Sequence, residues 1–399
     1  MMVGWIIFSL SFLALAHSYV FYPLLLKWLA QGKTNNTNVF APDDSNLPFV
    51  TVIMSLYNEE KVIGPKLETL LRQRYPTDKY NIIIGSDGSG DRTNEIVAQR
   101  VAGSASVQFF PFEQRRGKPE VINHLVRLAL ERRPAGPDHV FLVTDASVML
   151  REEVVFHLAK HFRNPQIAVV DAFMTHTGLE DAGISRSEDR YISGEVRLKH
   201  LESIVWRKMI GPFGGCYALR SDYFSPVPSN FLVDDFFITM RAFERGAQAI
   251  NEPLAVCHEP VSHEWREEYR RKARISAGNF QNMLLFRRLW WPPFTALSFA
   301  FFSHKILRWL GPFFLLGMAL GMALVVWQGN YFSRILFLCG TVAALLAPLA
   351  DVALKRMGVH VFLLRNLRYF LLMNIALFQG FFKFLKGIRS NVWEPTKRH

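Results

Sequence analysis

The chain has 399 residues, of which 50% are hydrophobic and 20% are charged, and its polar residues gather between about residues 31 and 292 while apolar runs occupy both ends. This distribution is typical of a water-folded domain attached to membrane segments, and three widely spaced cysteines exclude a disulfide framework and a Cys/His zinc site. Much of the formal net charge of +12 flanks the apolar runs, which favours membrane lipids over nucleic acid as the partner.

The first apolar run covers residues 3–29 and holds 24 consecutive residues without Lys, Arg, Asp or Glu before Lys27. Such a run is long enough to cross a bilayer core of about 30 Å. It lacks the basic opening and the small-residue ending of a cleavable signal peptide. The sequence therefore predicts a retained N-terminal transmembrane helix over residues 1–30.

The C-terminal part, residues 293–399, contains further apolar segments. Three of them have the length of a membrane span, namely 310–327, 335–349 and 369–384, which gives four predicted crossings in all. Residues 294–302 are too short to cross and suit the membrane interface instead.

Basic residues after the first span place the central domain, residues 31–292, in the cytoplasm. The chain is thus predicted to be a multi-pass protein of the bacterial inner membrane. A fourth full crossing would put the basic tail outside, against the charge rule, so the number of spans and the side of the C-terminus stay open. The tail residues concerned are Lys386, Arg389, Lys397 and Arg398.

The central domain alternates apolar strands with helical patterns. The predicted strands are 49–56, 80–84, 108–111 and 140–143, and the predicted helices are 93–100, 118–132 and 236–245. Repeated β-α units favour an α/β fold with a doubly wound, mainly parallel sheet. Ligands bind beyond the carboxyl ends of the strands in such sheets, so the residues that follow each strand are the first candidates for a site.

Polar motifs follow the first two predicted strands. YNEE stands at residues 57–60 and SDGS at residues 86–89. In SDGS the small neighbours let a base or ribose approach the backbone while Asp87 accepts hydrogen bonds. Asn and Asp are also common in loops and helix caps, so a structural role for each is the alternative.

Two further motifs suit a diphosphate. RRGK at residues 115–118 opens a predicted helix, where positive side chains and the helix N-terminus attract phosphate, although a solvated basic turn is the alternative. TDAS follows the last predicted strand, so Asp145 could bridge a divalent cation to a diphosphate, with Ser147 as a neutral ligand. A loop-capping role for Asp145 is again the alternative.

Adjacent acids, Asp234 and Asp235, precede the helix predicted at 236–245. One of them can face a cleft as the general base for an acceptor hydroxyl, while the other caps the helix or holds a basic partner. Upstream, GPFGGCY at residues 211–217 suits a sugar-binding wall, with a tight structural loop as the alternative. The basic segment 265–281 could bind a leaving diphosphate or lipid headgroups.

The motifs YNEE, SDGS, GK, TDAS, FGGCYALR, VDD and RRKARISAGNFQ occur in this order before the C-terminal spans. This arrangement resembles the membrane-bound family 2 glycosyltransferases over about residues 48–300. Synthases of cellulose, hyaluronan and poly-N-acetylglucosamine look similar in overall layout. The resemblance implies an inverting glycosyltransferase of the A-type fold that needs Mg²⁺ or Mn²⁺ and usually takes UDP-sugars.

The resemblance implies that Asp235 is the catalytic base, that Asp145 binds the metal, and that Lys118 lies near the donor phosphates. Combined with the motifs, it gives three candidate sets: Asp235 and Asp234 for catalysis; Tyr57, Asn58, Glu59, Asp87, Lys118, Asp145 and Arg274 for donor binding; and Gly214, Gly215 and Cys216 for acceptor binding. The chain departs from the family pattern twice. Ser147 replaces the second acid of the usual DxD motif, and RKARI at 271–275 replaces QxxRW, which weakens the case for processive synthesis.

The leading hypothesis is an enzyme that moves sugar from a nucleotide-sugar donor to a growing extracellular or capsular polysaccharide, for which polysaccharide-export subunits would be partners. The alternative is a single addition to a lipid or lipid-linked glycan. A catalytically inactive nucleotide-binding membrane scaffold is the hypothesis from outside the enzymes. A transporter is disfavoured because a polar domain of about 260 residues interrupts the spans.

Overall fold

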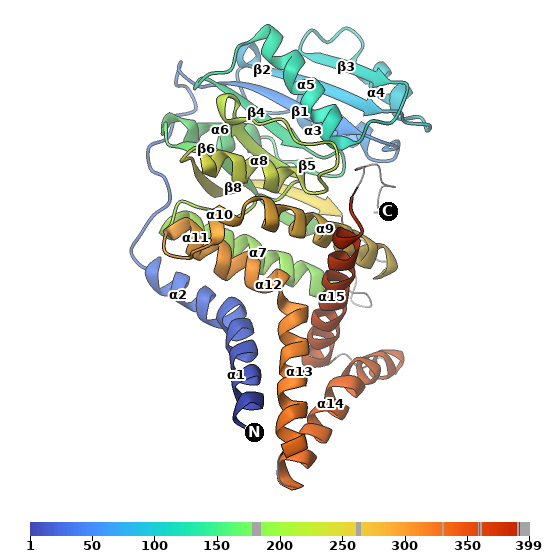
Figure 1. Ribbon diagram of the computed structural model, residues 1–399. Helices are drawn as coiled ribbons and strands as arrows, with labels where there is room; N and C mark the ends of the chain where they lie inside the picture. Colours follow the sequence, from blue (N-terminus) through green and yellow to red (C-terminus); the bar gives the residue numbers. More distant parts are fainter. Residues whose placement is uncertain are drawn as a thin grey trace.

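The computed structural model describes residues 1–177, 185–260, 265–328, 331–357, 359, 361–388 and 391. Three basic residues on which the side of the C-terminus depends, Arg389, Lys397 and Arg398, lie outside the described residues. The described chain forms a sheet-containing body from which a group of helices extends (Figure 1).

A single eight-stranded sheet lies in the described part of the chain. Its strands are β1 (Phe49–Leu56), β2 (Tyr80–Asp87), β3 (Val107–Phe112), β4 (His139–Thr144), β5 (Met149–Leu150), β6 (Ile167–Thr177), β7 (Cys216–Arg220) and β8 (Gln248–Pro260). Their order across the sheet is β3-β2-β1-β4-β7-β6-β8-β5. The four strands predicted from the sequence are all present, and the other four were not predicted.

The two halves of the sheet differ in strand direction. Strands β3, β2, β1 and β4 run parallel, as predicted. Strand β7 runs antiparallel to both β4 and β6, whereas β6 and β8 are parallel. Four of the seven strand pairings are parallel, so the sheet is mainly parallel as predicted, with antiparallel pairing at β7 and β5. Strand β2 was predicted to end at residue 84 but is longer, because it pairs with β3 as far as Asp87 and Phe112.

Helices cover both faces of the sheet, so the doubly wound arrangement is confirmed (Figure 1). On one face α3 (Ile63–Leu71), α4 (Thr93–Val101) and α6 (Val154–Ala159) share a core with alternate residues of β1. On the other face α5 (Lys118–Arg132) packs against β1 and β2, and α8 (Asp234–Glu244) packs against β6 and β8 in the same core. This alternation follows from the pleat, because successive side chains of a strand point to opposite faces.

The remaining helices complete the body and form the extension. They are α1 (Met2–Ala16), the π-helical turn η1 (His17–Phe21), α2 (Tyr22–Leu29), α7 (Ser185–Val205), α9 (Trp265–Leu285), α10 (Arg287–Trp290), α11 (Ala296–Phe301), the π-helical turn η5 (Phe302–Ile306), α12 (Leu307–Trp309), α13 (Gly311–Gln328), α14 (Tyr331–Arg356) and α15 (Phe362–Leu385). Short 3₁₀ helices are η2 (Thr77–Lys79), η3 (Lys160–Arg163) and η4 (Ser221–Tyr223). Figure 1 shows α1, α13 and α14 extending away from the sheet.

Among the described residues, one continuous helix is long and apolar enough to cross a membrane, Met2–Leu29. A second span exists only if the pair Ala296–Trp309 and Gly311–Trp327, bent by 65°, is counted as one. Helices α14 and α15 form where the last two crossings were predicted but do not pass the same test. Both carry charged residues along their length, and one such pair, Arg368 and Asp351, forms an ion pair of 3.0 Å. The structure therefore supports one or two of the four predicted crossings.

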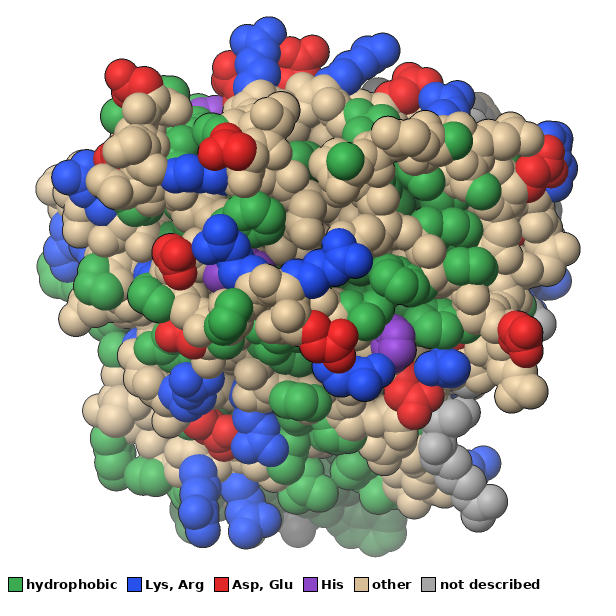
Figure 2. All heavy atoms as spheres, turned by 90° about the horizontal axis from the view of Figure 1, so that it is seen from above, with side chains coloured by type: hydrophobic (Ala, Val, Ile, Leu, Met, Phe, Trp, Pro, Cys, Tyr) green, Lys and Arg blue, Asp and Glu red, His purple; other side chains and the backbone are tan. Residues whose placement is uncertain are grey.

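The two ends of the molecule present different surfaces. Large apolar side chains are exposed on the extending helices, among them Trp327 at 84% and Phe332 at 72%. Figure 2 looks onto the opposite end, where Lys, Arg, Asp and Glu side chains are spread over the surface of the sheet-containing body. Large exposed apolar surfaces of this kind are typical of segments that contact a membrane or a partner protein.

Helices α1 and α13 cross with their backbones almost in contact at Gly321. A Cβ atom built on Gly321 would lie 2.6 Å from the backbone nitrogen of Phe8 and 2.7 Å from the carbonyl oxygen of Gly4. Small residues permit such close helix crossings in membrane proteins. The N-terminal helix is thus packed into the helical extension rather than separate from it.

Replacing Gly321 with Leu should force α1 and α13 apart, and we expect it to lower the free energy of unfolding by about 1–3 kcal/mol, the range for overpacked interiors. Thermal unfolding of the full-length protein in detergent measures this loss. The control is Ala323→Leu, which adds bulk at an exposed position of the same helix and should leave the midpoint unchanged. Equal midpoints for the two variants would contradict the close crossing.

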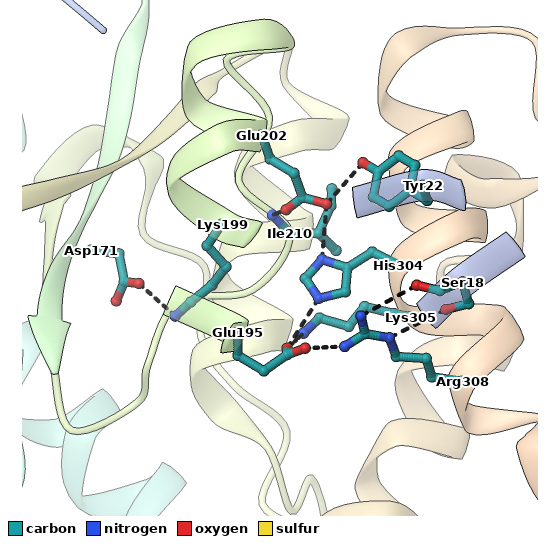
Figure 3. A network of polar contacts seen from close by, with 10 residues as sticks. All are labelled: Ser18, Tyr22, Asp171, Glu195, Lys199, Glu202, Ile210, His304, Lys305 and Arg308. Carbon is teal, nitrogen blue, oxygen red and sulfur yellow. Dashed lines mark hydrogen bonds and ion pairs between the residues drawn. The ribbon is translucent and has the colours of Figure 1, made fainter. Parts of the chain in front are cut away.

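A buried ionic network joins α7 to the helical segment 302–309 (Figure 3). Glu195 contacts Nε2 of His304 at 3.0 Å and Nζ of Lys305 at 2.8 Å, and it also pairs with Arg308. Glu202 contacts Nδ1 of His304 at 2.8 Å. Both ring nitrogens of His304 thus lie within hydrogen-bond distance of a carboxylate oxygen. Burial raises the pKa of Glu195, but Lys305, Arg308 and His304 outweigh it and hold this pKa well below its usual range.

Helix α7 also connects the N-terminal helix with the sheet. The Tyr22 hydroxyl donates to Glu202 at 2.9 Å, and Lys199 pairs with the buried Asp171 of β6 at 2.6 Å (Figure 3). Asp171 in turn accepts a hydrogen bond of 2.7 Å from the backbone nitrogen of Phe213, which precedes β7. The extending helices are therefore linked through α7 to the loop before β7.

Candidate active site

A cleft of about 370 Å³ opens at the carboxyl ends of β1, β2 and β4, where the topology predicts a ligand site. The predicted site residues that line it are Tyr57, Asn58, Glu59, Asp87, Lys118, Asp145, Gly214, Gly215, Asp234, Asp235 and Arg274. Cys216 does not line it. As the first residue of β7 it is fully buried beneath the loop, so its side chain is not offered to an acceptor.

The loops after β1 and β2 are tied to each other. Asn58 has a positive φ of 53° and its Oδ1 accepts a hydrogen bond of 2.9 Å from the nitrogen of Gly90. The nitrogen of Glu59 donates to Oγ1 of Thr93 at 2.8 Å. These bonds give YNEE a structural role in addition to its place on the wall of the cleft. The loop-forming alternative considered for Asn58 is thereby confirmed in part.

Asp87 organises the turn that begins α5. Its carboxylate is 2% exposed and accepts hydrogen bonds from the backbone nitrogens of Arg116 at 2.6 Å and Gly117 at 2.9 Å. The carboxylate also lies 4.0 Å from Nε of Arg115, and Asp87 lines the cleft. The guanidinium of Arg115 lies over the Tyr57 ring, 3.5 Å from its centroid. The turn and the tyrosine together form one side of the cleft.

Lys118, the first residue of α5, bridges acids from two other elements. Its Nζ lies 2.8 Å from Oδ1 of Asp145 and 3.7 Å from Oδ2 of Asp234. Burial lowers the pKa of Lys118, but the two carboxylates outweigh it and raise this pKa above its usual value. The ammonium group is therefore a fixed positive charge in the cleft at neutral pH.

The two adjacent acids have different surroundings. Asp234 is buried and pairs with Lys118. Asp235 faces the loop before β7 so closely that a Cβ atom on Gly214 would lie 2.6 Å from its Oδ2. Burial and the neighbouring charge of Asp234 raise the pKa of Asp235 to about 7. One acid thus holds a basic partner while the other is poised to exchange a proton near neutral pH.

Helix α9 is hydrogen-bonded to the loop that precedes Asp234 and Asp235. Gln281 accepts from the nitrogen of Leu232 at 3.2 Å and donates to the carbonyl of Asn230 at 3.0 Å. Arg274 donates to the carbonyl of Leu232 at 3.3 Å, and burial together with Arg271 lowers the pKa of Arg274 to about 10. The predicted basic segment therefore reaches the cleft through Arg271 and Arg274.

Oxygen ligands for a divalent cation are present in part. Asp145 and Ser147 line the cleft with Glu259, and the Ser147 hydroxyl donates to Glu259 at 3.3 Å. Within the described ranges no three Asp, Glu, His or Cys side chains form a ready metal cluster. Oxygen-only ligands suit Mg²⁺ or Mn²⁺, with diphosphate oxygens completing the shell, so the residues fit such an ion.

Glu259 was missed at the sequence level. It stands near the end of β8, a strand that was not predicted, and is 3% exposed. The available signal was an acid after the apolar run at residues 254–257. Asn391 was missed as well. It lies far along the chain but lines the cleft, where its amide donates to the carbonyl of Phe231.

Comparison with curated proteins finds distant relatives. The chain is 24% identical over 261 residues to a probable glycosyltransferase, YdaM, of Bacillus subtilis, which covers 60% of this chain and 57% of the relative. It is 24% identical over 127 residues to a beta-monoglucosyldiacylglycerol synthase of Trichormus variabilis, covering 31% of this chain and 26% of that one. The chain thus spans less than two thirds of the length of these relatives.

Among solved structures, a similar one is the mannosyltransferase PcManGT from Pyrobaculum calidifontis, in complex with GDP-Man and Mn²⁺. It has a TM-score of 0.68 at 22% identity and covers 95% of this chain and 99% of that chain. Because the match covers 95% of this chain, it includes both the sheet and the helices. It supports the A-type glycosyltransferase fold that the motif order implied.

Family models match the chain directly. The model described as glycosyl transferase family 2 matches residues 51–225, and the model of glycosyl transferase family group 2 matches residues 140–350, more than half of the chain. Together they include every predicted site residue. The chain is a member of the family 2 group of glycosyltransferases.

Proposed function

We propose that the chain is an inverting, metal-dependent glycosyltransferase that moves sugar from a nucleotide-sugar donor to a growing extracellular or capsular polysaccharide. The observation that carries this proposal is the bridge that Lys118 makes between Asp145 and Asp234, next to Asp235, in one cleft. A cation, a metal-binding acid and a base with a pKa of about 7 are the groups that such a transfer requires.

The donor would lie along the carboxyl ends of β1, β2 and β4. The nucleoside would contact Asp87 beside Tyr57, and the diphosphate would lie near Lys118, Arg115 and Arg274. Charged groups of this kind bind phosphate oxygens by short, charge-assisted hydrogen bonds. The family resemblance favours a UDP-sugar. A GDP-sugar is the second choice, because the structural neighbour PcManGT holds GDP-Man.

Asp145 would hold Mg²⁺ or Mn²⁺ with help from Ser147 and Glu259. When bound, such an ion neutralises the charge that develops on the departing diphosphate. Lys118 would contribute a second positive charge at the same position, and this charge is part of the protein itself. The lysine and a metal held by the acids would thus stabilise the negative charge of the departing nucleoside diphosphate.

Asp235 would act as the general base. It removes the proton of an acceptor hydroxyl as that oxygen bonds to the anomeric carbon, and the bond from this carbon to the diphosphate breaks on the opposite side. The configuration of the sugar is inverted by this displacement. A base with a pKa near neutrality is both available and strong enough for the transfer.

A single addition to a lipid or lipid-linked glycan is the second candidate. Helix α9, which lines the cleft with Arg271 and Arg274, packs closely on the apolar helix α15, where a Cβ atom on Gly380 would lie 2.4 Å from the Cβ of Ser276. The cleft is therefore connected to the helices that we place in the membrane. The departure from QxxRW at residues 271–275 also favours a non-processive enzyme.

We place the protein in the bacterial inner membrane, with residues 31–292 in the cytoplasm and the apolar helices in the bilayer. The exposed apolar side chains of the extending helices support this placement. Polysaccharide-export subunits would be partners only if the product is a polymer.

The test is nucleotide release by the purified full-length protein with membrane lipids, a panel of UDP- and GDP-sugars, and Mn²⁺ or Mg²⁺. We expect metal-dependent release from one donor, and sizing of the labelled product separates a polymer from a single addition. Release from no donor in the presence of candidate acceptors would contradict the proposal and favour the inactive scaffold.

A further inference from the structure

Lys66 of α3 is a lysine with no exposed surface, directly beneath the loop that carries Asp145. Its Nζ donates to Oγ1 of Thr144 at 2.7 Å and to the carbonyl of Val148 at 2.5 Å. These two partners flank Asp145, Ala146 and Ser147 in the sequence. One ammonium group therefore holds both ends of the loop.

The contacts of Lys66 are with neutral oxygens. In the part of the chain that the structure describes, no carboxylate lies within ion-pair distance of its Nζ. Burial lowers the pKa of Lys66 to about 8, so the group is still largely charged at neutral pH. A buried charge without an ionic partner lowers the free energy of unfolding, because it is removed from water.

The loop above Lys66 is connected to the general base. Thr144 Oγ1 donates to the carbonyl of Gly215 at 2.9 Å, and the nitrogen of Asp145 donates to the same carbonyl at 3.0 Å. Gly215 follows Gly214, the residue that packs against Asp235. The hydrogen bonds thus run from Lys66 through the Asp145 loop to the loop that Asp235 contacts.

We propose that Lys66 is a positioning residue that holds residues 144–148 in the geometry needed to bind the metal and diphosphate, and that its buried charge attracts this anionic group from below. The inference rests on the proposed function of the cleft. It assigns to α3 a role in donor binding that none of its exposed residues carries. The charge is retained at a cost in stability because the donor site uses it.

Binding of UDP and of GDP in the presence of Mn²⁺, measured calorimetrically on the full-length protein in detergent, tests this role without turnover. We expect Lys66→Met to weaken binding of the preferred nucleotide by about 10- to 100-fold, as for the loss of hydrogen bonds to a charged group. A merely structural lysine would lose stability and leave the affinity of the folded protein unchanged, and that result would overturn the proposal.

Arg220→Met is the matched control. Arg220 is a buried cation that also donates to carbonyls, those of Pro137, Phe162, Asn164 and Ile167, at the other end of β7. This variant should lower the unfolding midpoint and leave nucleotide affinity unchanged. If it weakens affinity as much as Lys66→Met does, the effect is not specific to the Asp145 loop and the proposal fails.

Thr144→Val covers the case in which Lys66→Met does not fold. It removes one acceptor of Lys66 and the link to Gly215 with little change in volume, and we expect a weaker affinity for nucleotide with Mn²⁺. Wild-type affinity in this variant would overturn the inference while leaving the proposed function intact. Absence of UDP and GDP binding in the wild type would instead overturn the proposed function and the inference with it.

Discussion

Asp235→Asn is expected to lower the rate of sugar transfer by about 10²- to 10⁴-fold, the usual contribution of a general base, while nucleotide binding with Mn²⁺ is retained. The amide keeps the shape of the side chain beside Gly214 but cannot accept the proton of the acceptor hydroxyl. Asp234→Asn is the matched variant on the neighbouring residue. Because Asp234 pairs with Lys118, its loss should weaken donor binding more than it slows turnover. Steady-state kinetics with saturating donor separate the two, and equal losses of kcat in both variants would contradict the assignment.

The same assignment predicts a pH profile. Burial and Asp234 raise the pKa of Asp235 to about 7, so the base is increasingly protonated as the pH falls below 7. The value of kcat/KM should therefore decrease about tenfold per pH unit below this point. The charged and titratable groups that face Asp235 are Asp234 on α8, Lys118 on α5, Asp145 after β4, Arg274 on α9 and Tyr217 on β7. A profile that is flat between pH 5.5 and 8 would exclude Asp235 as the base.

The raised pKa also has a consequence for stability. A carboxyl whose pKa is higher in the folded than in the unfolded state binds its proton more tightly when folded, so stability falls as the pH rises from the unfolded pKa towards 7. At pH 8 the wild type carries this cost in full. Asp235→Asn should then have a higher unfolding midpoint than the wild type at pH 8, although it transfers sugar more slowly. This opposition between stability and activity is typical of catalytic groups.

The sequence was sufficient to locate the acids at strand ends. Asp87 and Asp145 each follow an apolar, β-branched run, and parallel strands bring their carboxyl ends to one edge. The hydrophobic pattern therefore predicted both the first half of the sheet and the cleft beside it. It did not predict β6, β7 and β8, because antiparallel pairing and a long separation in sequence leave no repeated β-α unit to recognise.

Some individual residues were misassigned or missed because their positions depend on contacts that the sequence pattern does not reveal. Cys216 stands next to two cleft glycines, yet it begins a buried strand and is fully enclosed. Lys66 lies on a helix where a charged residue is normally solvated, and only the packing of α3 under the Asp145 loop reveals its contacts. Asn391 is brought to the cleft by the C-terminal helix α15. In each case the position depends on contacts between distant segments, which periodicity and motifs do not encode.

At the apolar ends of the chain, composition predicted where helices form but not which of them can cross a membrane. The lengths of the apolar runs predicted four transmembrane helices, and helices form at all four places. Whether each crosses a bilayer depends on charges such as Asp351 and Arg368, which pair with each other between α14 and α15. The close contact of α9 with α15 places these helices against the catalytic body. The C-terminal part contributes Asn391 to the lining of the cleft.

Asp145→Asn is expected to abolish metal-dependent donor binding, with the affinity for UDP or GDP in Mn²⁺ falling by more than about 100-fold, the upper range for the loss of a group that supports a metal site. The variant removes the acid nearest to Lys118 and leaves that lysine with Asp234 alone. Titration of Mn²⁺ in the presence of nucleotide measures the effect. Glu259→Gln should have a smaller effect, because the Ser147 hydroxyl donates to Glu259 and the amide oxygen of Gln can still accept this hydrogen bond.

The residual affinity of Asp145→Asn is informative in its own right. Lys118 and Arg274 still attract the diphosphate when no ion is held, so weak binding that no longer responds to Mn²⁺ is the expected result. Binding that keeps its full dependence on Mn²⁺ would show that other ligands hold the ion. In that case Asp145 would pair with Lys118 and would not bind the metal. The replacement of the second acid of the DxD motif by Ser147 would then mark a site in which Lys118 supplies the positive charge that a metal supplies in other family members.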